Sequence, residues 1–506
     1  MKIIIQAGGK GTRLEQLTFN KPKALVSINN LPMIMHLFKL FKNDEFLIIG
    51  DYKFDVLKTY LQTFATEYNY KIIKANNDGT SAGIKDCLNF IQDNEPFIIS
   101  WCDLIMSENF KLPNDLSKNY IGISKEYECR WSYIDNKFVK IPSKENGIAG
   151  FFIFKNKQEI TDVPESGSFV GGFLSNKNIE FNKLDLFSSK EIGTMVSYNA
   201  NNNNNTICRP FNKIEFLNNE KPEKILKTYI TEQGKKIHEN EVNWYKKINQ
   251  LNFKNIPNIY NFEPLIMDKI NGKNIFKYNY LDKKEKEKIL IQIINILKNL
   301  HSLDKEIDAN IKDLQEAYIN KTFDRIQKVQ DLIPFAHREE IIINGKKCKN
   351  IFFIKEKIEK IIKNTFSKKF VLIHGDCTFS NIMYDEIKNE PILIDPRGYF
   401  GGTKCYGDEY YDWAKLYYSL VGNYDQFNNK NFILKIHEDN VELNINSNEW
   451  EYLEDKFFEL LPNIDRNKIK LLHSIIWLSL TTYAWDNYDS ICGSFYNGLL
   501  KLNEVL

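Results

Sequence analysis

Short apolar runs alternate with amphipathic stretches over the first hundred residues of the chain. Short apolar runs bounded by glycine or polar residues are typical of buried strands, whereas apolar residues that recur every three or four positions are typical of helices. The order of these patterns predicts a doubly wound α/β domain. We expect strands at residues 2–7, 45–49, 71–74 and 96–101, and helices at residues 33–41 and 53–66.

The second half of the chain opens with a different pattern. Residues 211–216 and 223–229 are two strand-like segments joined by a short polar segment, which predicts a β-hairpin. Asp282 with Glu285 forms the capping-box pattern that begins a long amphipathic helix through His301.

An asparagine-rich segment separates the two patterns. Residues 199–205 are asparagine except for one alanine, and they include no apolar side chain large enough to bury. Such a composition is typical of a linker or an exposed loop. We therefore expect two domains, residues 1–205 and residues 206–506.

The composition is that of a globular protein, with 43% hydrophobic and 26% charged residues. The formal net charge of +2 on 506 residues gives no indication of a nucleic-acid or membrane-surface partner. The 8 cysteines include no Cys-x-x-Cys pair, which predicts neither a zinc site nor a disulfide framework. The sequence shows neither a signal-peptide core nor an apolar run of roughly twenty residues. We expect a cytoplasmic protein that acts on small molecules.

A glycine-rich segment follows the first predicted strand. Glycines in this position let the backbone approach a triphosphate, whose charge main-chain N–H groups and a basic side chain can neutralise. A second cationic element, KPKAL at residues 21–25, follows closely and strengthens the prediction of an anion site. The residues concerned are Ala7, Gly8, Gly9, Gly11, Thr12, Arg13 and Lys23.

These two segments resemble the signature of the nucleotidyltransferases that make nucleotide sugars, and of the bacterial phosphocholine cytidylyltransferases. The resemblance implies that the first segment wraps a nucleoside triphosphate, that Arg13 stabilises charge developing on the α-phosphate, and that Lys23 contacts the phosphates. The loop at residues 76–83 is similar to the family's base and ribose loop. That similarity implies that Gly79 and Thr80 bind the nucleotide.

Asp103 follows the apolar run at residues 96–101. A carboxylate at the carboxyl end of a buried strand lies where open α/β sheets place their ligands, although an aspartate in a turn is the alternative. Asp103 resembles the family's metal-binding aspartate, whose partner lies in an Asp-Ile-Gly-Thr motif. This chain has Glu191 at that place. The resemblance implies that Asp103 and Glu191 hold Mg²⁺ during an in-line displacement that releases pyrophosphate.

Two residues fall where the family holds the phosphorylated acceptor. Lys140 is expected to contact the acceptor phosphate, and Trp131 is expected to line the acceptor pocket. The alternative is a surface lysine and an aromatic residue on an edge strand.

The most specific pattern of the second half lies at residues 373–397. Phosphoryl transfer needs a carboxylate that accepts the proton of the attacking hydroxyl, and oxygen ligands for Mg²⁺ on the nucleotide phosphates. Asp376 is the expected base, and Asn381 and Asp395 are the expected Mg²⁺ ligands. The segment resembles the catalytic loop of the aminoglycoside phosphotransferase and choline kinase superfamily, relatives of protein kinases. A polar loop between two strands is the alternative.

The same resemblance implies an α+β, bilobal protein-kinase-like fold with an N-lobe at about residues 206–270 and a C-lobe at about residues 271–506. ATP is then the phosphoryl donor. A lysine on the second hairpin strand would grip its phosphates, and a glutamate on a helix at residues 238–248 would hold that lysine. The best matches are Lys227 and Glu241, with Lys224 and Glu239 as alternates.

Further residues of the second half have expected supporting roles. Asp412 is expected to anchor the catalytic loop and His374 to brace it, whereas His301 is expected to be a core or capping residue. The helical tail carries four aromatic residues that form either a cage for a quaternary ammonium group or part of the core. They are Trp477, Tyr483, Trp485 and Tyr488.

The two implied activities act in series on one small molecule. The kinase phosphorylates an alcohol with ATP, and the nucleotidyltransferase couples that phosphate to a nucleotide and releases pyrophosphate. CTP is favoured because a kinase and a cytidylyltransferase are paired in choline activation; the acceptor is a choline-like amino alcohol, a sugar or a polyol. The CDP-activated product would serve capsule or lipopolysaccharide decoration. The alternative is a nucleotide-sugar pyrophosphorylase with a regulatory or scaffolding pseudokinase domain.

Overall fold

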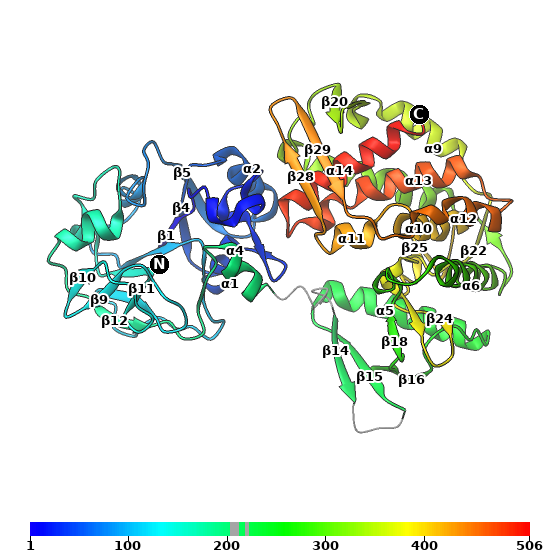
Figure 1. The fold of residues 1–506 in the computed structure, drawn as a ribbon, viewed down its shortest axis with the longest axis horizontal. Coiled ribbons are helices and arrows are strands. Elements are labelled where there is room, and N and C mark those ends of the chain that lie inside the picture. The colour runs from blue at the N-terminus through cyan, green and yellow to red at the C-terminus, as the bar shows by residue number, and fades with distance from the viewer. Residues whose placement is uncertain (203–211, 218–221) are drawn as a thin grey trace. The chain divides into compact units, whose positions relative to one another are not determined.

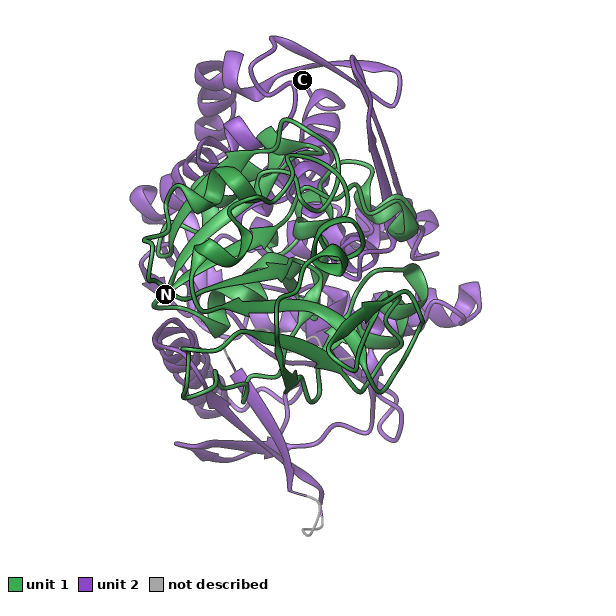
Figure 2. Ribbon diagram, turned by 90° about the vertical axis from the view of Figure 1, so that its left-hand side faces the viewer, with its two compact units in different colours: residues 1–204, 484–489 green, residues 205–483, 490–506 purple. Residues whose placement is uncertain are grey.

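The computed structural model describes residues 1–202, 212–217 and 222–506 (Figure 1). The chain folds into two compact units, which Figure 2 shows in different colours. Unit 1 comprises Met1–Asn204 and Ala484–Asp489, and unit 2 comprises Asn205–Tyr483 and Ser490–Leu506. Residues 484–489, which the sequence analysis placed in the second domain, are counted with unit 1. The domain division at residues 205 and 206 stays a prediction.

A mixed sheet, parallel at its centre, organises unit 1. Its strands follow the order β10-β9-β11-β6-β1-β4-β5, and β8 and β12 extend it beside β11. The predicted α/β class is confirmed, and each predicted strand and helix of the first hundred residues is present. The strands are β1 (Lys2–Gln6), β4 (Glu45–Gly50), β5 (Asn69–Lys74), β6 (Phe97–Trp101), β8 (Tyr120–Ser124), β9 (Ser132–Ile134), β10 (Lys137–Val139), β11 (Gly147–Phe154) and β12 (Asn182–Asp185).

The centre of the sheet positions the loops that carry the predicted chemistry. β1 pairs in parallel with β4 and β6, so that Gln6 lies opposite both Ile49 and Trp101. The carboxyl ends of these strands therefore meet at one edge. Around the sheet lie α1 (Met33–Leu40), α2 (Phe54–Phe64), α3 (Ile84–Leu88) and α4 (Met195–Asn201), with two short paired strands, β7 (Leu104–Ile105) and β13 (Lys190–Glu191), beyond its edge.

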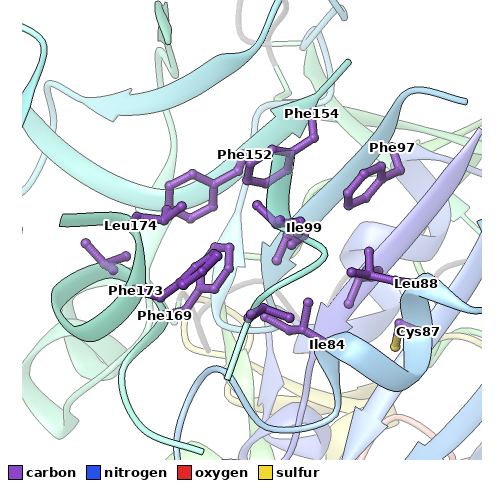
Figure 3. Close-up of a cluster of buried hydrophobic side chains, with 14 of the residues drawn as sticks. Ile84, Cys87, Leu88, Phe97, Ile99, Phe152, Phe154, Phe169, Phe173 and Leu174 are labelled. Atoms are coloured by element: carbon purple, nitrogen blue, oxygen red, sulfur yellow. The ribbon is translucent and has the colours of Figure 1, made fainter. Parts of the chain in front are cut away.

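An aromatic cluster covers one face of this sheet (Figure 3). Alternate residues of β6 and β11 point into it, and the ring centroids of Phe97 and Phe154 lie 5.4 Å apart. Phe152 lies edge-to-face with Phe169 at 5.6 Å. Burial of each such side chain stabilises the fold by about 1.5–3 kcal/mol. The cluster fixes the segment around Phe169 against the sheet, together with residues of α3 that include Ile84, Cys87 and Leu88.

Unit 2 begins with a small antiparallel sheet of order β14-β15-β17-β16. The predicted hairpin is confirmed for β14 and β15, while Phe211 and residues 218–220 of that prediction lie outside the described residues. The helix predicted at residues 238–248 is longer than expected, because Thr231 caps its first turn. The elements are β14 (Asn212–Leu217), β15 (Lys224–Tyr229), α5 (Glu232–Gln250), β16 (Ile259–Phe262) and β17 (Leu265–Asp268).

Helices make up most of the rest of unit 2. The capping box predicted at Asp282 and Glu285 is present in both directions at the start of α6. None of the helices in the described part of the chain has the length and apolar character needed to cross a bilayer. The helices are α6 (Lys283–His301), α7 (Ile311–Gln315), α8 (Lys321–Lys328), α9 (Lys355–Asn364), α10 (Glu409–Leu420), α11 (Tyr424–Asn428), α12 (Glu454–Leu460), α13 (Arg466–Ser479) and α14 (Tyr488–Asn503).

Short strands support the loop at residues 373–381. β22 ends just before that loop, and β23 and β24 form a hairpin after it. A separate four-stranded sheet has the order β21-β20-β29-β28. The strands are β18 (Gly272–Asn274), β20 (Glu340–Ile343), β21 (Lys346–Lys349), β22 (Lys369–Leu372), β23 (Ile382–Asp385), β24 (Glu390–Leu393), β27 (Tyr406–Gly407), β28 (Phe432–Ile436) and β29 (Asn440–Ile445).

One expectation about the chain needs correction, and one alternative is decided in favour of the core. Asn199 and Asn201 are helical rather than loop residues, because Thr194 and Ser197 cap α4 reciprocally and the helix continues to Asn201. Trp477 does not take part in a ligand cage. Its side chain is fully buried in α13, where its indole N–H donates to His473 Nε2 at 2.9 Å.

Candidate active sites

Two glycines determine the shape of the loop after β1. A Cβ atom on Gly8 would lie 2.9 Å from the Cβ of Asp51, which leaves no space for a side chain. Gly11 has a φ of +65°, in the left-handed region that glycine adopts at little cost, and its Cβ position lies 3.1 Å from the Cβ of Lys23. The glycine loop therefore packs against the stem of Lys23, which joins the two predicted phosphate-binding segments.

The rest of this loop is accessible. No heavy atom of the described residues, beyond the two neighbours in the chain, lies within 4 Å of the Cβ position of Gly9, so that a ligand can approach the backbone there. Thr12 and Arg13 are exposed. Ala7 is buried, and its N–H donates to the carbonyl of Ile49 at 2.9 Å, which fixes the start of the loop to β4.

Lys23 forms an ion pair with Asp103. The two side chains are 13% and 8% exposed. Burial alone would lower the pKa of Lys23. The Asp103 carboxylate and the negative groups next to it act in the opposite direction, and together they raise this pKa. A charged lysine therefore lies on the carboxylate that the sequence analysis assigned to Mg²⁺.

The pairing of β7 with β13 brings the two predicted metal ligands of unit 1 together. The N–H of Ile192 donates to the carbonyl of Asp103 at 3.0 Å, next to Glu191. Burial raises the pKa of Glu191, and the Asp103 carboxylate raises it further. Two carboxylates that repel each other in this way form a favourable site for a divalent cation.

Two arginines face the same carboxylate. The Cβ position of Gly193 lies 2.8 Å from Glu191 Oε1 and 3.5 Å from Arg13 Nη2, so both side chains converge on this glycine. The positive charges of Arg13 and Arg130 oppose the increase in the pKa of Glu191. Arg130 was not among the predicted site residues, although it precedes the predicted Trp131.

The predicted base and ribose loop is tied to the end of β1. Gln6 Nε2 donates to the carbonyl of Thr80 at 2.8 Å, and Thr80 Oγ1 accepts from the N–H of Phe169 at 2.8 Å. Gly79 has a φ of +106°, and a Cβ there would lie 2.3 Å from the carbonyl oxygen of Gly167. Gly79 and Thr80 are thus held beside the strand that leads into the glycine loop. Sequence reasoning missed Gln6.

The predicted acceptor residues lie in different environments. Trp131 is half-buried against the aromatic cluster, and a Cβ on Gly171 would lie 2.3 Å from its ring. Lys140 is exposed just after β10. The described contacts do not join either residue to Asp103 or Glu191, so their roles in binding an acceptor stay predictions.

In unit 2 a buried lysine joins two carboxylates. Lys227 Nζ donates to both oxygens of Glu241 at 2.7 Å and to Asp395 Oδ1 at 2.6 Å. Burial alone would lower the pKa of Lys227, but Asp395 and Glu241 outweigh it and the pKa is raised. The alternates point elsewhere: Lys224 lies over the ring of Tyr260, and Glu239 is exposed.

The predicted base and the predicted amide ligand lie in contact. Asn381 Nδ2 donates to Asp376 Oδ2 at 2.8 Å and to the carbonyl of Asp376 at 2.9 Å. These bonds use the amide nitrogen, so the amide oxygen of Asn381 is the atom that could bind a cation. Asp395 has a φ of +54°, an uncommon conformation for a non-glycine residue that persists where the surroundings enforce it.

Lys415 is a residue of this site that the sequence analysis did not assign. Its Nζ lies 2.9 Å from Asp376 Oδ1, opposite the oxygen that Asn381 contacts. Burial would lower the pKa of Lys415, but Asp376 reverses the effect and the pKa is raised. The two contacts fix both oxygens of the Asp376 carboxylate. Lys415 lies three residues after Asp412, one turn further along α10.

Asp412 accepts hydrogen bonds from the backbone of the loop at residues 373–381. Its Oδ2 accepts from the N–H of His374 at 2.8 Å, and its Oδ1 accepts from the N–H of Gly375 at 2.7 Å. His301 Nε2 also contacts Asp412, at 3.1 Å. Burial lowers the pKa of His374, whose ring contacts the carbonyl of Ile394 at 2.9 Å. The expected anchor and brace are therefore both observed as contacts.

Comparison with known families matches one model to each half of the chain. Residues 2–118 match the nucleotidyl transferase family, and residues 218–432 match the phosphotransferase enzyme family. The chain therefore carries a nucleotidyl transferase domain and a phosphotransferase domain. The predicted resemblances are confirmed for both halves.

Relatives of the nucleotidyl transferase domain include two curated proteins. CTP:phosphoglutamine cytidylyltransferase of Campylobacter jejuni is 33% identical over 141 residues, 26% of this chain and 56% of that protein. Mannose-1-phosphate guanyltransferase of Saccharomyces cerevisiae is 32% identical over 129 residues, 24% of this chain and 36% of that protein. The chain thus spans between about a third and somewhat more than half of these relatives. A crystal structure of HddC from Yersinia pseudotuberculosis is 24% identical, with a TM-score of 0.34, and the match covers 40% of this chain and 97% of that one.

The donor sets of both domains fit Mg²⁺ that arrives with a nucleotide. No group of three or more His, Cys, Asp or Glu side chains within residues 1–202, 212–217 and 222–506 forms a metal cluster. The nucleotidyl transferase domain instead offers Asp103 and Glu191, and the phosphotransferase domain offers Asp395 and Asn381. Mg²⁺ in nucleotide enzymes is commonly held by one or two protein oxygens, with phosphates and waters completing its shell.

Proposed function

We propose that the protein is a bifunctional enzyme that phosphorylates a small hydroxyl compound and then couples the new phosphate to a nucleotide. The observation that carries this proposal is that both sets of predicted residues converge in one chain. Asp103, Lys23 and Glu191 lie together in unit 1, and Asp376 and Asn381 lie together in unit 2. In unit 2, Lys227 further connects the predicted metal ligand Asp395 to Glu241.

In the phosphotransferase reaction the acceptor hydroxyl attacks the γ-phosphorus of ATP, and ADP leaves. Asp376 would accept the hydroxyl proton, and its contacts with Asn381 and Lys415 orient its carboxylate for that step. Lys227, held by Glu241, would contact the nucleotide phosphates. Mg²⁺ on Asp395 and Asn381 would neutralise charge on the transferred group when it is bound.

In the nucleotidyl transfer reaction an oxygen of the acceptor phosphate attacks the α-phosphorus of the nucleotide, and pyrophosphate leaves. Arg13 and Lys23 would stabilise the negative charge that grows on the α-phosphate. Gly8, Gly9 and Gly11 would present main-chain N–H groups to the triphosphate. Gly79 and Thr80 would contact the base and ribose. We place Lys140 and Trp131 at the acceptor phosphate and its attached group.

CTP is our choice of nucleotide. The Campylobacter relative is named as a CTP-dependent cytidylyltransferase, which supports CTP, whereas the yeast relative is named as a guanyltransferase and supports GTP. The product would be a CDP-activated compound that donates its phosphorylated group to a surface polysaccharide. Because ATP and CTP are cytoplasmic metabolites, we expect the enzyme to act in the cytoplasm.

The alternative is a nucleotide-sugar pyrophosphorylase whose second domain is a pseudokinase. The contacts of Asp376 with Asn381 and of Asp395 with Lys227 argue against it, because a domain that only binds nucleotide has no need of an oriented base.

A two-stage assay of the purified full-length chain tests the proposal. ATP, Mg²⁺ and a panel of alcohols, sugars and hydroxy acids are supplied first, and ADP release is measured. CTP, GTP, UTP and dTTP are then added separately, and pyrophosphate release is measured. We expect ADP release with one acceptor class, then pyrophosphate release that depends on the product of the first stage. Pyrophosphate release from supplied sugar phosphates, without ADP release from any acceptor, would support the pseudokinase instead.

A further inference from the structure

Four basic side chains gather beside the catalytic loop of unit 2, around the buried ring of Tyr411. Lys321 Nζ lies 5.6 Å from the centroid of this ring, and Lys415 Nζ lies 5.9 Å from it. Arg397 Nη1 donates to the Tyr411 hydroxyl at 3.1 Å. Arg325 lies one turn after Lys321 on α8 and is held by the carbonyl of Ser479 at 2.7 Å. We call Lys321, Arg325, Arg397 and Lys415 the basic cluster.

The basic cluster adjoins the predicted base. Lys415 Nζ is 2.9 Å from Asp376 Oδ1. The backbone of the catalytic loop touches Arg397 as well, because a Cβ on Gly375 would lie 2.9 Å from the Cβ of Arg397. A molecule that presents a hydroxyl to Asp376 would therefore lie beside these cations.

The positive charge of the cluster exceeds the negative charge around it. Across the described residues, no carboxylate lies within 4 Å of Lys321, Arg325 or Arg397, and the side chain of Lys321 makes no hydrogen bond there. All four side chains are partly exposed, so they are open to a ligand. The acidic groups facing the cluster are Asp376, which Lys415 and Asn381 already contact, and Glu316, which acts on Lys321.

Like charges held together in a partly buried position are costly unless an anion joins them. The pKa of Lys321 reflects this cost: burial lowers it well below its usual value, and Arg397, Arg325 and Lys415 lower it further. An anionic ligand would relieve the repulsion and form charge-assisted hydrogen bonds with these groups.

We propose that the basic cluster binds an anionic group of the phosphoryl acceptor. On this inference, which rests on the proposed kinase function, the acceptor is a hydroxyl compound that carries a carboxylate or a phosphate. It is not a quaternary ammonium alcohol such as choline. The ATP phosphates have a separate set of groups, since the network of Lys227, Glu241 and Asp395 includes none of the four cluster residues.

The aromatic residues of the tail agree with this assignment. Trp477 is buried in the core, and the exposed ring of Tyr483 lies 4.8 Å from the guanidinium of Arg325. A ligand cation at this place would meet the basic side chains of the cluster. The sequence predicted an amino alcohol, a sugar or a polyol as the acceptor. The basic cluster favours forms of these compounds that carry a carboxylate or a phosphate.

The first test compares acceptors that differ only in charge. The full-length chain with ATP and Mg²⁺ is given glycerol, glycerate and glycerol 3-phosphate, and in parallel glucose, glucuronate and glucose 6-phosphate, with choline and ethanolamine. We expect kcat/KM for ADP release to be about tenfold or more higher for an anionic member than for its neutral counterpart. Carboxylate and phosphate are distinguished within each series. A neutral or cationic compound as the best acceptor overturns the inference, whereas absence of ADP release with every compound overturns the proposed kinase function instead.

The second test uses variants of Lys321. Lys321→Gln should raise KM for the best acceptor by about tenfold while KM for ATP changes by less than about twofold, because the charge contacts only the acceptor. Lys321→Arg should restore most of the affinity. Lys357→Gln, an exposed lysine of α9, is the matched control and should change neither constant. An increase in KM for ATP with an unchanged acceptor KM would assign the cluster to the nucleotide, and equal thermal unfolding of the variants checks the fold.

Discussion

Both sites pair a lysine with a carboxylate, but the number of carboxylates on the lysine differs between them. In each, a lysine lies on the aspartate predicted to bind Mg²⁺: Lys23 on Asp103 and Lys227 on Asp395. Lys227 has a second carboxylate, Glu241, at 2.7 Å, whereas the described contacts of Lys23 include one ion pair, to Asp103. If Mg²⁺ bound the aspartate, Lys227 would keep its contact with Glu241, whereas Lys23 would lose the ion pair that the described contacts give it and could bind a phosphate. We therefore expect the second carboxylate to hold Lys227 more firmly than Lys23 is held.

The largest expected effect separates the two chemistries. Asp376→Asn should reduce phosphorylation by about a hundredfold or more, because the variant has no base for the hydroxyl proton, and should leave nucleotidyl transfer onto a supplied phosphorylated acceptor unchanged. Asp103→Asn should show the opposite pattern. ADP and pyrophosphate release are measured on each variant. Loss of both activities in either variant would contradict two independent sites.

The next effect concerns stability. Lys227→Met should destabilise the protein by about 3–5 kcal/mol, because it leaves Glu241, only 2% exposed, without its cation. Lys23→Met should cost less, about 1–3 kcal/mol, since its single partner keeps some access to water. Urea unfolding of the full-length variants measures both. Equal costs would remove the distinction between the two lysines.

A buried carboxylate near Asp376 makes the stability of unit 2 depend on pH. Burial raises the pKa of Asp425 to about 6, so the folded state binds this proton more tightly than the unfolded state does. The stabilising contribution of the protonated form is complete below the ordinary aspartate pKa and is lost as the pH rises through about 6. Asp425→Asn should therefore stabilise the protein by roughly 1–3 kcal/mol at pH 8.

Denaturant unfolding at pH 4 and at pH 8 tests this dependence. At pH 4, where the wild-type side chain is protonated, the benefit of Asp425→Asn should be much smaller. The same benefit at both values would show that Asp425 does not titrate in this range.

The smallest effects are expected at the alternates of the lysine pair. Lys224→Gln and Glu239→Gln should change stability by less than about 0.5 kcal/mol, because Lys224 lies over Tyr260 and Glu239 is exposed. KM for ATP should also stay unchanged. A clear increase in KM for either variant would exchange the assignments of Lys227 and Lys224, or of Glu241 and Glu239.

The sequence was most informative where the chemistry is local. The contact between Asp376 and Asn381 is set by one tight loop, and the glycine loop by residues that must be glycine for steric reasons, so short segments carried enough information. Short apolar runs likewise predicted the central strands of unit 1. Lys227 was preferred over Lys224 because Ile225 and Leu226 precede it, with Lys224 on the opposite face of the strand.

Residues that reach one of the sites from a distant segment of the chain were not predictable. Lys415 reaches Asp376 from α10, Gln6 reaches Thr80, and Lys321 meets Arg397 only in the folded chain. Each of these contacts depends on how segments distant in the sequence pack together, which no local pattern specifies. The aromatic residues of the tail were ambiguous for the same reason, since burial rather than residue type determines whether Trp477 binds a ligand.

The hydrogen bonds from the catalytic loop to Asp412 have a consequence for how that loop can move. Asp412 and Lys415 lie on the same face of α10, and both attach to the catalytic loop, one at the amides of His374 and Gly375 and the other at Asp376. We therefore expect helix α10 and the loop to move together, so that any shift of α10 would carry the Asp376 carboxylate with it.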